Sequence, residues 1–311
     1  MKKQIKVFAP ATVANVVCGF DVLGFALDYP GDEVILKLKE KPGITISRIE
    51  GDKGKLTLIP NHNAVSISIA SFMKSIQSNQ GLDIQLYKNM PLNSGLGSSA
   101  ASAVAGVYAA NELLGKPLSK EELLPFALQS EKYVCGSAHA DNVAPALIGG
   151  FVLVRSYEPL DIVKIPVPQE LYCTVVHPHI SISTKEARQI LKNQIPLNEV
   201  TQQMGDIAGM ITGLLTNDYD LISRSMNDII AEPVRSKLIP GFRRVKNAAL
   251  EAGALGCGIS GSGPSLFALC VSKKIAANTA ESMQNVFSSI KIDSDMYISK
   301  INQTGVKVIN N

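Results

Sequence analysis

The sequence has few cysteines, little net charge and no long apolar segment, and each shortage excludes a class of protein. The five cysteines are an odd number, stand far apart and include no CxxC pair, which argues against a disulfide framework and a zinc site. The net charge is only +3 and the 30 lysines and arginines are scattered, so no footprint for nucleic acid or a membrane surface appears. We therefore expect a cytoplasmic protein whose partner is a small molecule, with no nucleic acid and no membrane as partners.

The apolar segments are too short or too interrupted to serve as membrane spans or as a secretion signal. Lys2 and Lys3 precede an apolar stretch at 7–20, but Pro10 interrupts it and no small-residue cleavage site follows. The longest uncharged apolar run elsewhere, 143–154, cannot span a bilayer. With 311 residues, 46% of them hydrophobic, the chain exceeds the usual size of one core, so we expect two domains. The sequence does not distinguish a monomer from a homodimer.

The first half of the chain mixes strand-like and helix-like patterns. Period-two alternation and apolar runs predict strands at 34–38, 44–49, 56–59, 83–88 and 151–154. Helical spacing and propensity predict helices at 63–78 and about 99–114. The capping box Ser119–Glu122 predicts another helix, which carries Glu131 and is followed by a loop at 135–144.

The second half begins again with a strand and predicts a separate α+β unit. Strands are expected at 172–176, 265–270 and 296–299, with helical stretches between 184 and 252 and one more helix before the last strand. Three prolines cluster at 159–168 between the two halves. We therefore predict an α+β protein with two domains, 1–160 and 161–311.

A glycine-rich loop at 95–100 lies between a predicted strand and a predicted helix. The first amides of a helix lack partners and carry the positive end of its dipole, so this loop is a candidate anion site. Its glycines allow close approach to phosphate oxygens, and Ser98 or Ser99 offers a hydroxyl to phosphate or Mg²⁺. The lysine of a Walker A loop is missing, and the second strand of a dinucleotide-binding fold is not predicted. A plain glycine turn is the alternative.

Two further groups of residues fit phosphoryl transfer without proving it. Glu131 and the segment His139-Ala-Asp141-Asn142 have groups that can hold Mg²⁺ and position or deprotonate an alcohol, although such side chains are often merely solvated. The segment 256–264 has four glycines in nine residues, which fits either ligand contact or a tight chain crossing.

Three motifs together resemble those of the GHMP kinases, the small-molecule kinases named for galactose, homoserine, mevalonate and phosphomevalonate. They are APATVANVVCGFDVLGFAL (9–27), PLNSGLGSSAAS (91–102) and GCGISGSGPS (256–265). The segments SAHADNVAPALIGG and STKEAR are similar to those of the homoserine kinase branch. The resemblance implies an N-terminal ribosomal-protein-S5-like α/β domain and a C-terminal ferredoxin-like α+β domain. It also implies ATP and Mg²⁺ as cofactors and L-homoserine as the substrate, which is phosphorylated on its hydroxyl in threonine biosynthesis.

The resemblance also assigns roles to individual residues. ATP is expected to contact Asn63, Val65, Pro91, Leu92, Asn93, Ser94, Gly95, Leu96, Gly97, Ser98, Ser99, Ala100 and Ala101. Ser99 and Glu131 are expected to hold Mg²⁺. The amino alcohol is expected to contact Asn15, Asp21, His139, Asp141, Thr184, Arg188 and Arg235, with the two arginines on its carboxylate.

The resemblance leaves the catalytic step itself open. We predict that Asn142 orients the acceptor hydroxyl and that the proton passes late, to the γ-phosphate itself. Asp141 is either a base, as in mevalonate-type relatives, or a substrate ligand. The alternatives for the whole chain are a mevalonate or phosphomevalonate type of kinase, a nicotinamide-binding oxidoreductase, and an inactive binding module.

Overall fold

The first of the two layers of the protein consists of a seven-stranded sheet and the helices that cover it. The sheet is built by the N-terminal half and the last strand of the chain. The computed structural model describes residues 3–309, apart from the side chains of residues 134 and 135. The central strands are β1 (Gln4–Ala14), β2 (Leu23–Lys39), β3 (Ile44–Glu50) and β4 (Gly81–Tyr87), in the order β1-β2-β4-β3. The hairpin of β5 (Phe151–Tyr157) and β6 (Leu160–Ile165) pairs with the start of β2, and β11 (Lys307–Ile309) pairs with β1.

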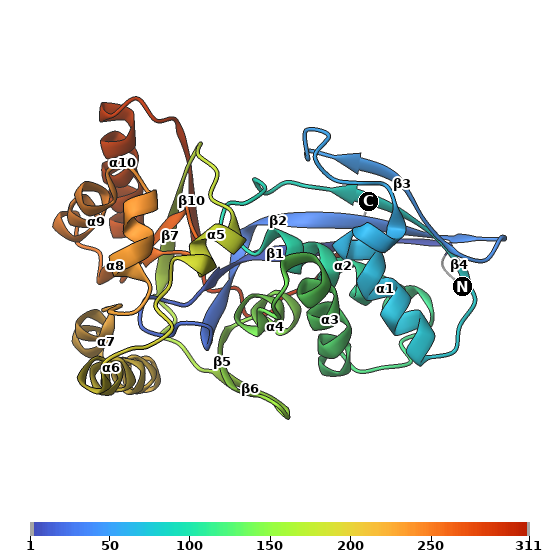
Figure 1. Ribbon diagram of the computed structural model, residues 1–311, viewed down its shortest axis with the longest axis horizontal. Helices are drawn as coiled ribbons and strands as arrows, with labels where there is room; N and C mark the ends of the chain where they lie inside the picture. Colours follow the sequence, from blue (N-terminus) through green and yellow to red (C-terminus); the bar gives the residue numbers. More distant parts are fainter. Residues whose placement is uncertain (1–2, 310–311) are drawn as a thin grey trace.

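Four helices cover one face of this sheet (Figure 1). They are α1 (Ala64–Ser75), α2 (Ser98–Leu113), α3 (Leu124–Cys135) and α4 (Ala140–Ile148). Short 3₁₀ turns at Pro60–His62 and Glu121–Leu123 precede α1 and α3. Helix α2 is the central one, since almost all its residues are buried and most are alanine or another small residue. Its small side chains let it pack closely on β1 and β2, and its first turn carries the glycine loop.

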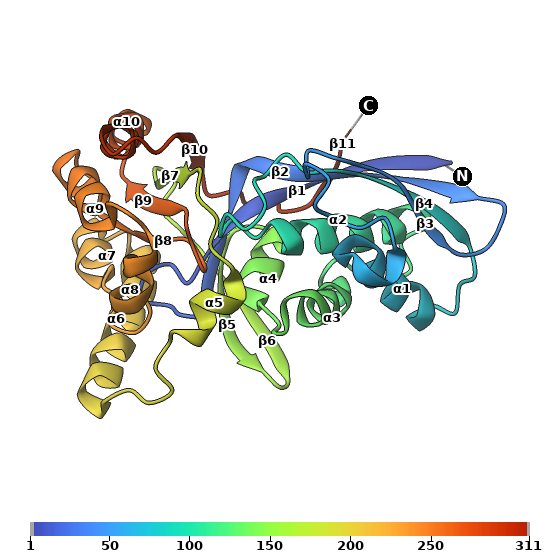
Figure 2. The same cartoon turned by 45° about the horizontal axis from the view of Figure 1, so that its top comes forward.

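The second layer consists of a four-stranded antiparallel sheet, in the order β10-β7-β9-β8, and the helices around it. Its strands are β7 (Tyr172–Pro178), β8 (Gly256–Ile259), β9 (Leu266–Cys270) and β10 (Ser294–Lys300). Its helices are α5 (Thr184–Gln189), α6 (Leu197–Thr216), α7 (Tyr219–Ser225), α8 (Glu232–Arg235), α9 (Phe242–Glu251) and α10 (Lys273–Ser289), with a 3₁₀ turn at Ser236–Leu238. Figure 2 shows α5 next to α8, on the side that faces the helices of the first layer.

One aromatic contact joins the two layers into a continuous core. Phe25 of β2 stacks on Phe151 of β5 with ring centroids 5.6 Å apart, and it meets the edge of Phe267 of β9 at 6.0 Å. All three side chains are fully buried. Burial of one such ring contributes about 2 to 3 kcal/mol, so this contact holds the two layers at a defined distance from each other.

The predicted α+β architecture with two units is confirmed, and two local predictions are wrong. Residues 56–59 form no strand: Asp52 accepts hydrogen bonds from the amides of Gly54 and Leu56 and folds this segment into a loop. The predicted loop at 135–144 becomes helical at Ala140, because the carbonyl of His139 accepts the amides of the next turn.

The division at residue 160 stays a proposal, and the sheet suggests where to refine it. Strand β6 belongs to the first sheet and ends at Ile165, and β11 returns to that sheet from the far end of the chain. We therefore propose the boundary after Ile165, with 307–309 counted in the N-terminal unit. No helix formed by residues 3–309 combines the length and the apolar character that a membrane span requires.

Candidate active site

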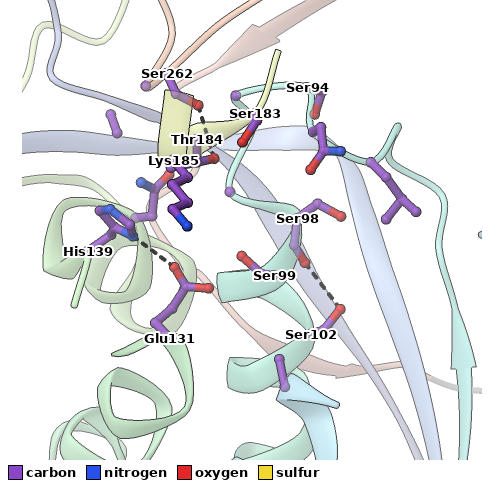
Figure 3. Close-up of a pocket in the computed structure, with 18 of the residues that line it drawn as sticks. Ser94, Ser98, Ser99, Ser102, Glu131, His139, Ser183, Thr184, Lys185 and Ser262 are labelled. Carbon is purple, nitrogen blue, oxygen red and sulfur yellow. Dashed lines mark hydrogen bonds and ion pairs between the residues drawn. The ribbon is translucent and has the colours of Figure 1, made fainter. Parts of the chain in front are cut away.

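A cavity of about 480 Å³ lies between the helices of the first layer and α5. Its walls come from the end of β1, the segment before α1, the glycine loop, the end of α3 with the start of α4, the start of α5, and residues 261–262. Figure 3 shows side chains from these segments pointing toward one another around the N-terminus of α2. All three sequence motifs therefore meet at one place.

The glycine loop needs its glycines because it runs against two other segments. Gly95 and Gly97 have φ values of +78° and +67°, which side chains with a Cβ adopt only with strain. A Cβ on Gly95 would lie 2.3 Å from the carbonyl oxygen of Ser260, and one on Gly97 would lie 2.2 Å from the hydroxyl oxygen of Thr12. Gly97 is the N-cap residue of α2 and has no side chain to cap it, so the first amides of α2 face the cavity region as an anion site.

A buried ion pair between Lys88 and Asp32 supports the glycine loop on the side of the sheet. Lys88, directly after β4, donates to Asp32, to the carbonyl of Ser98 at 2.8 Å and to the hydroxyl of Ser102 at 2.7 Å. The Lys88 and Asp32 side chains are 1% and 0% exposed. Because Lys88 bonds to the first turn of α2 and to β2, it fixes the start of the helix relative to the sheet.

Asn142 is oriented by a residue that sequence reasoning missed. The hydroxyl of Thr12, fully buried on β1, donates to the side-chain oxygen of Asn142 at 2.7 Å. With its oxygen engaged in this way, Asn142 keeps its amide hydrogens for the cavity that it lines. An amide in this position can donate to a hydroxyl or a phosphate oxygen.

Glu131, which is buried, and His139, which is partly buried, form a second hydrogen-bonded pair that lines the cavity. The Nδ1 atom of His139 lies 3.1 Å from Oε2 of Glu131, and its Nε2 atom lies 3.0 Å from the hydroxyl of Ser137. Burial lowers the pKa of His139, but the hydrogen bond and negative charge of Glu131 outweigh burial and raise it above its ordinary value. Figure 3 shows Glu131 and Ser99 facing each other beside the start of α2.

Asp141 is a buried carboxylate with an unused oxygen. It is 2% exposed, and its Oδ1 atom has no hydrogen-bond partner among the described residues. Burial, followed by the negative charge of Asp21, raises the pKa of Asp141 to about 7. Buried carboxylate oxygens normally accept hydrogen bonds, so the free oxygen of Asp141 can accept one from a ligand or contact a cation.

The glycine-rich segment 256–264 serves both as a chain crossing and as part of the cavity. The side chain of Asn15 donates to the carbonyl of Gly261 at 2.9 Å, and the hydroxyl of Ser260 donates to the carbonyl of Gly95 at 2.7 Å. Gly261 and Ser262 also line the cavity. The turn therefore ties the first motif to the phosphate loop, as a chain crossing does, and contributes to the cavity wall, while its contact with a ligand stays a prediction.

The two predicted arginines are in different electrostatic situations. Arg188 donates to both oxygens of Asp21, at 3.2 and 2.7 Å, and this pair is partly exposed. Arg235 is 4% exposed and donates only to main-chain carbonyls, those of Ala187 and Gly261, both at 3.0 Å. Within residues 3–309 no carboxylate pairs with Arg235, and burial lowers its pKa. The ring of Phe20 lies 5.7 Å from one guanidinium and 5.3 Å from the other.

The structure gathers most of the predicted site residues around this one cavity. Those that line it are Asn15, Asp21, Asn63, Leu92, Asn93, Ser94, Gly95, Gly97, Ser98, Ser99, Glu131, His139, Asp141, Asn142, Thr184, Arg188 and Arg235. Among the other residues of the predicted ATP set, Val65, Leu96, Ala100 and Ala101 are buried in the core, where they support the loop and α1, and Pro91 lines a neighbouring groove. The ligand roles of all these residues remain predictions.

Several lining residues were not anticipated. They include Lys55, Lys88, Ser183, Lys185 and Ser262. Lys88 and Lys185 had an available signal, because one ends the strand before the loop and the other lies inside the segment STKEAR.

Comparisons with known proteins agree with this geometry. Residues 63–150 match the model of the GHMP kinases N terminal domain, and residues 210–289 match that of the GHMP kinases C terminal domain. The homoserine kinase of Chlorobium phaeobacteroides (strain BS1) is 52% identical over 99% of this chain and 100% of its own. The crystal structure of homoserine kinase from Cytophaga hutchinsonii superimposes with a TM-score of 0.98 at 59% identity, covering 99% and 98% of the two chains.

A more distant structure shares only the fold. The mevalonate kinase of L. major superimposes with a TM-score of 0.74 at 18% identity, over 97% of this chain and 98% of its own. The predicted α+β fold with two units is that of the GHMP kinases. Since full-length relatives share half or more of its residues, the chain belongs to the homoserine kinases of the GHMP kinase superfamily.

Proposed function

We propose that this enzyme transfers the γ-phosphoryl group of ATP to the hydroxyl of L-homoserine, giving O-phospho-L-homoserine for threonine biosynthesis. The observation that carries the proposal is Arg235. Its guanidinium is 4% exposed and forms no ion pair within residues 3–309. Burial lowers its pKa although the charges of Asp21 and Asp228 act on it from a distance, so an anion from a ligand would offset the cost of burying this charge. The α-carboxylate of an amino acid fits this position, because a guanidinium binds a carboxylate through two parallel hydrogen bonds.

The ammonium group of the substrate has a matching anion. Asp141 is buried and has an oxygen without a partner, and Asp21 lies close enough for its charge to raise the pKa of Asp141. An ammonium placed between them would satisfy the free oxygen and remove the repulsion. A mevalonate-type acid has a carboxylate but no ammonium, so it would leave the free oxygen of Asp141 without a donor. The structure therefore favours an amino alcohol over the mevalonate-type alternative.

The phosphate groups would lie on the glycine loop and the first turn of α2. The amides there bind phosphate oxygens, while Lys88 and Asp32 keep the loop in place. Asn142, oriented by Thr12, would donate to the acceptor hydroxyl and direct its oxygen toward the γ-phosphorus. Phosphoryl transfer has a loose transition state, so this positioning needs no strong base, and we assign Asp141 to substrate binding. The oxidoreductase alternative fails because the chain continues from α2 into α3 rather than into a second parallel strand.

The donors around the loop also fit Mg²⁺. The Glu131 carboxylate and the Ser99 hydroxyl are hard oxygen ligands that face each other beside the first turn of α2 (Figure 3). When bound, Mg²⁺ would neutralise charge on the β- and γ-phosphates. His139 holds Glu131 in orientation through its hydrogen bond. We also propose a cytoplasmic location, with which the four cysteines that have described side chains agree, since all four are free and buried. A homodimer stays a proposal.

One substrate analogue and one variant test the assignment of Arg235. 3-Aminopropan-1-ol lacks the carboxylate of homoserine but keeps its ammonium and its hydroxyl. We expect Arg235→Met to raise the KM for homoserine by about 100-fold, since a bidentate charged contact is lost. The variant should leave the poor KM for 3-aminopropan-1-ol unchanged, because that analogue has no carboxylate to lose.

The control is Arg244→Met, which removes an exposed arginine that bonds to Ser289 far from the cavity. Turnover of 3-aminopropan-1-ol by Arg235→Met also shows that the variant is folded. An equal loss for both acceptors would contradict carboxylate binding by Arg235.

A further inference from the structure

Positive charge near the phosphoryl group lowers the barrier to its transfer, and the glycine loop contains no cationic side chain. In phosphoryl transfer, charge moves onto the oxygen that bridges the β- and γ-phosphorus atoms, and positive groups beside it lower the barrier. Many nucleotide-binding loops include a lysine for this purpose, but residues 91–101 contain neither lysine nor arginine. A lysine or arginine that assists Mg²⁺ beside the γ-phosphate must therefore come from elsewhere on the cavity wall.

Five lysines and arginines line the cavity, and three of them are already engaged. They are Lys55, Lys88, Lys185, Arg188 and Arg235. Lys88 is buried in its ion pair beneath the loop, Arg188 is paired with a carboxylate, and Arg235 is held by two carbonyls. Of the five, only the side chains of Lys55 and Lys185 have neither an ion pair nor a hydrogen bond among the described residues. These two are the cations available to the phosphates.

Their positions differ. Lys55 lines the cavity beside Leu56 and Asn63, at the end that precedes α1. Lys185 is the second residue of α5, and Figure 3 shows its side chain extending from α5 into the cavity, toward the side where Ser99 and Glu131 lie. Lys185 therefore points toward the first turn of α2, where the terminal phosphates would lie.

The start of α5 is anchored, which gives the Lys185 side chain a defined origin. Ser183 caps the helix by accepting the amide of Glu186, and the hydroxyl of Thr184 lies 3.3 Å from that of Ser262 in the glycine-rich turn. The main chain on either side of Lys185 is thereby tied to the cavity wall. The long side chain itself is exposed and unpaired, so it can follow the phosphoryl group during transfer.

We propose that Lys185 is a catalytic residue whose ammonium group contacts the γ-phosphoryl group and the β–γ bridging oxygen. The inference rests on the proposed kinase function. In the reaction, the bond between the γ-phosphorus and the bridging oxygen breaks, and that oxygen leaves on ADP with the electron pair. A bond forms between the acceptor oxygen and the γ-phosphorus, and the hydroxyl proton passes to an oxygen of the transferred phosphoryl group. The positive charge of Lys185 balances the charge that grows on the bridging oxygen.

This role predicts an effect on kcat rather than on either KM. The charge on the bridging oxygen is greater in the transition state than in bound ATP, so the ammonium stabilises the transition state more than the ground state. Loss of one such donor typically lowers kcat by about 100-fold or more. A structural role for Lys185 would instead change stability or the affinity for substrates.

The experiment compares four variants of the full chain in an assay of homoserine-dependent ADP release. They are Lys185→Met, Lys185→Arg, Lys55→Met and Lys192→Met; the last removes an exposed lysine that does not line the cavity. We expect Lys185→Met to lower kcat by about 100-fold, with both KM values within about 3-fold of wild type. Lys185→Arg should retain more activity than Lys185→Met, and Lys192→Met should match wild type. Lys55→Met should change the KM for ATP more than kcat.

Chemical rescue separates catalysis from structure. A Lys185→Ala variant leaves space beside the phosphates, and added ethylamine or propylamine should restore part of its kcat in a saturable way. The same amines should not activate Lys192→Met. A kcat for Lys185→Met within about 3-fold of wild type would overturn the proposal, and so would a loss that neither arginine nor amines restore. If wild type released no homoserine-dependent ADP, the proposed function would fail instead.

Discussion

Asp141 gives the most detailed prediction, because its raised pKa makes substrate binding depend on pH. Its pKa of about 7 means that much of the free enzyme has a neutral Asp141 below neutral pH. A neutral carboxyl group binds an ammonium poorly. We expect kcat/KM for homoserine to rise about 10-fold per pH unit up to about pH 7 and then to level off. Asp141→Asn stays neutral at every pH, so this limb should disappear in the variant.

The assay measures kcat/KM for homoserine at saturating ATP from about pH 5.5 to about pH 8.5. The pKa of His139 is raised by the hydrogen bond and charge of Glu131, and His139 faces the same cavity. Because His139 is retained in Asp141→Asn, its contribution is what remains in the variant. At pH 8 the variant should show a KM about 100-fold higher, with kcat within a few-fold of wild type. An unchanged KM with a collapsed kcat would show that Asp141 is a base, and an identical pH limb in the variant would refute the link to its ionisation.

The same shift predicts how stability depends on pH. The pKa of Asp141 is higher in the folded chain than its ordinary value of 3.8, so the folded state binds this proton more tightly than the unfolded state. Stability from this group is complete below about pH 4 and is lost as the pH rises to about 7. A shift of this size corresponds to about 4 kcal/mol. Thermal unfolding at pH 8 should therefore show Asp141→Asn to be more stable than wild type, and equal or lower stability would contradict the predicted cost of ionising Asp141.

Three substitutions around the phosphate loop have separate expected outcomes. Lys88→Met leaves Asp32 buried without its partner and should lower stability by about 3 to 5 kcal/mol in chemical unfolding; a loss below 1 kcal/mol would show that the pair is not needed. Gly97→Ala forces a Cβ to within 2.2 Å of Thr12 at a positive φ, so kcat/KM for ATP should fall about 100-fold, and unaltered kinetics would mean that the loop can move. Thr12→Val removes the donor to Asn142 and should lower kcat about 10-fold at constant KM; a change confined to KM would contradict its positioning role.

The phosphate loop could be predicted from sequence because its signals are local. A strand, two glycines, two serines and an alanine-rich helix follow one another within about thirty residues, and each feature depends on its neighbours in the chain. The observed α2 begins at Ser98, one residue before the predicted start. The capping box at Ser119 also formed, with the Glu122 carboxylate accepting both the amide and the hydroxyl of Ser119.

The contacts that orient the site could not be predicted in this way. Thr12 and Asn142 are 130 residues apart, and Lys88 and Asp32 are 56 apart, so their pairing depends on the packing of β1, β2 and α4. The burial of Arg235 is equally a property of the fold, since arginine is usually exposed. The strand expected at 56–59 does not form, which shows that local contacts can also defeat a sequence pattern. The alternating run is short, and the amides of Gly54 and Leu56 donate to the carboxylate of Asp52 and fold the segment into a loop.

The central claim, that this chain phosphorylates homoserine, is tested most directly by identifying the product. Purified enzyme with ATP and Mg²⁺ should release ADP in proportion to added L-homoserine, with one equivalent of O-phospho-L-homoserine detected by ³¹P NMR. Mevalonate, phosphomevalonate, galactose and shikimate in parallel reactions should give only background ADP. Absence of homoserine-dependent ADP, or faster phosphorylation of mevalonate than of homoserine, would contradict the assignment.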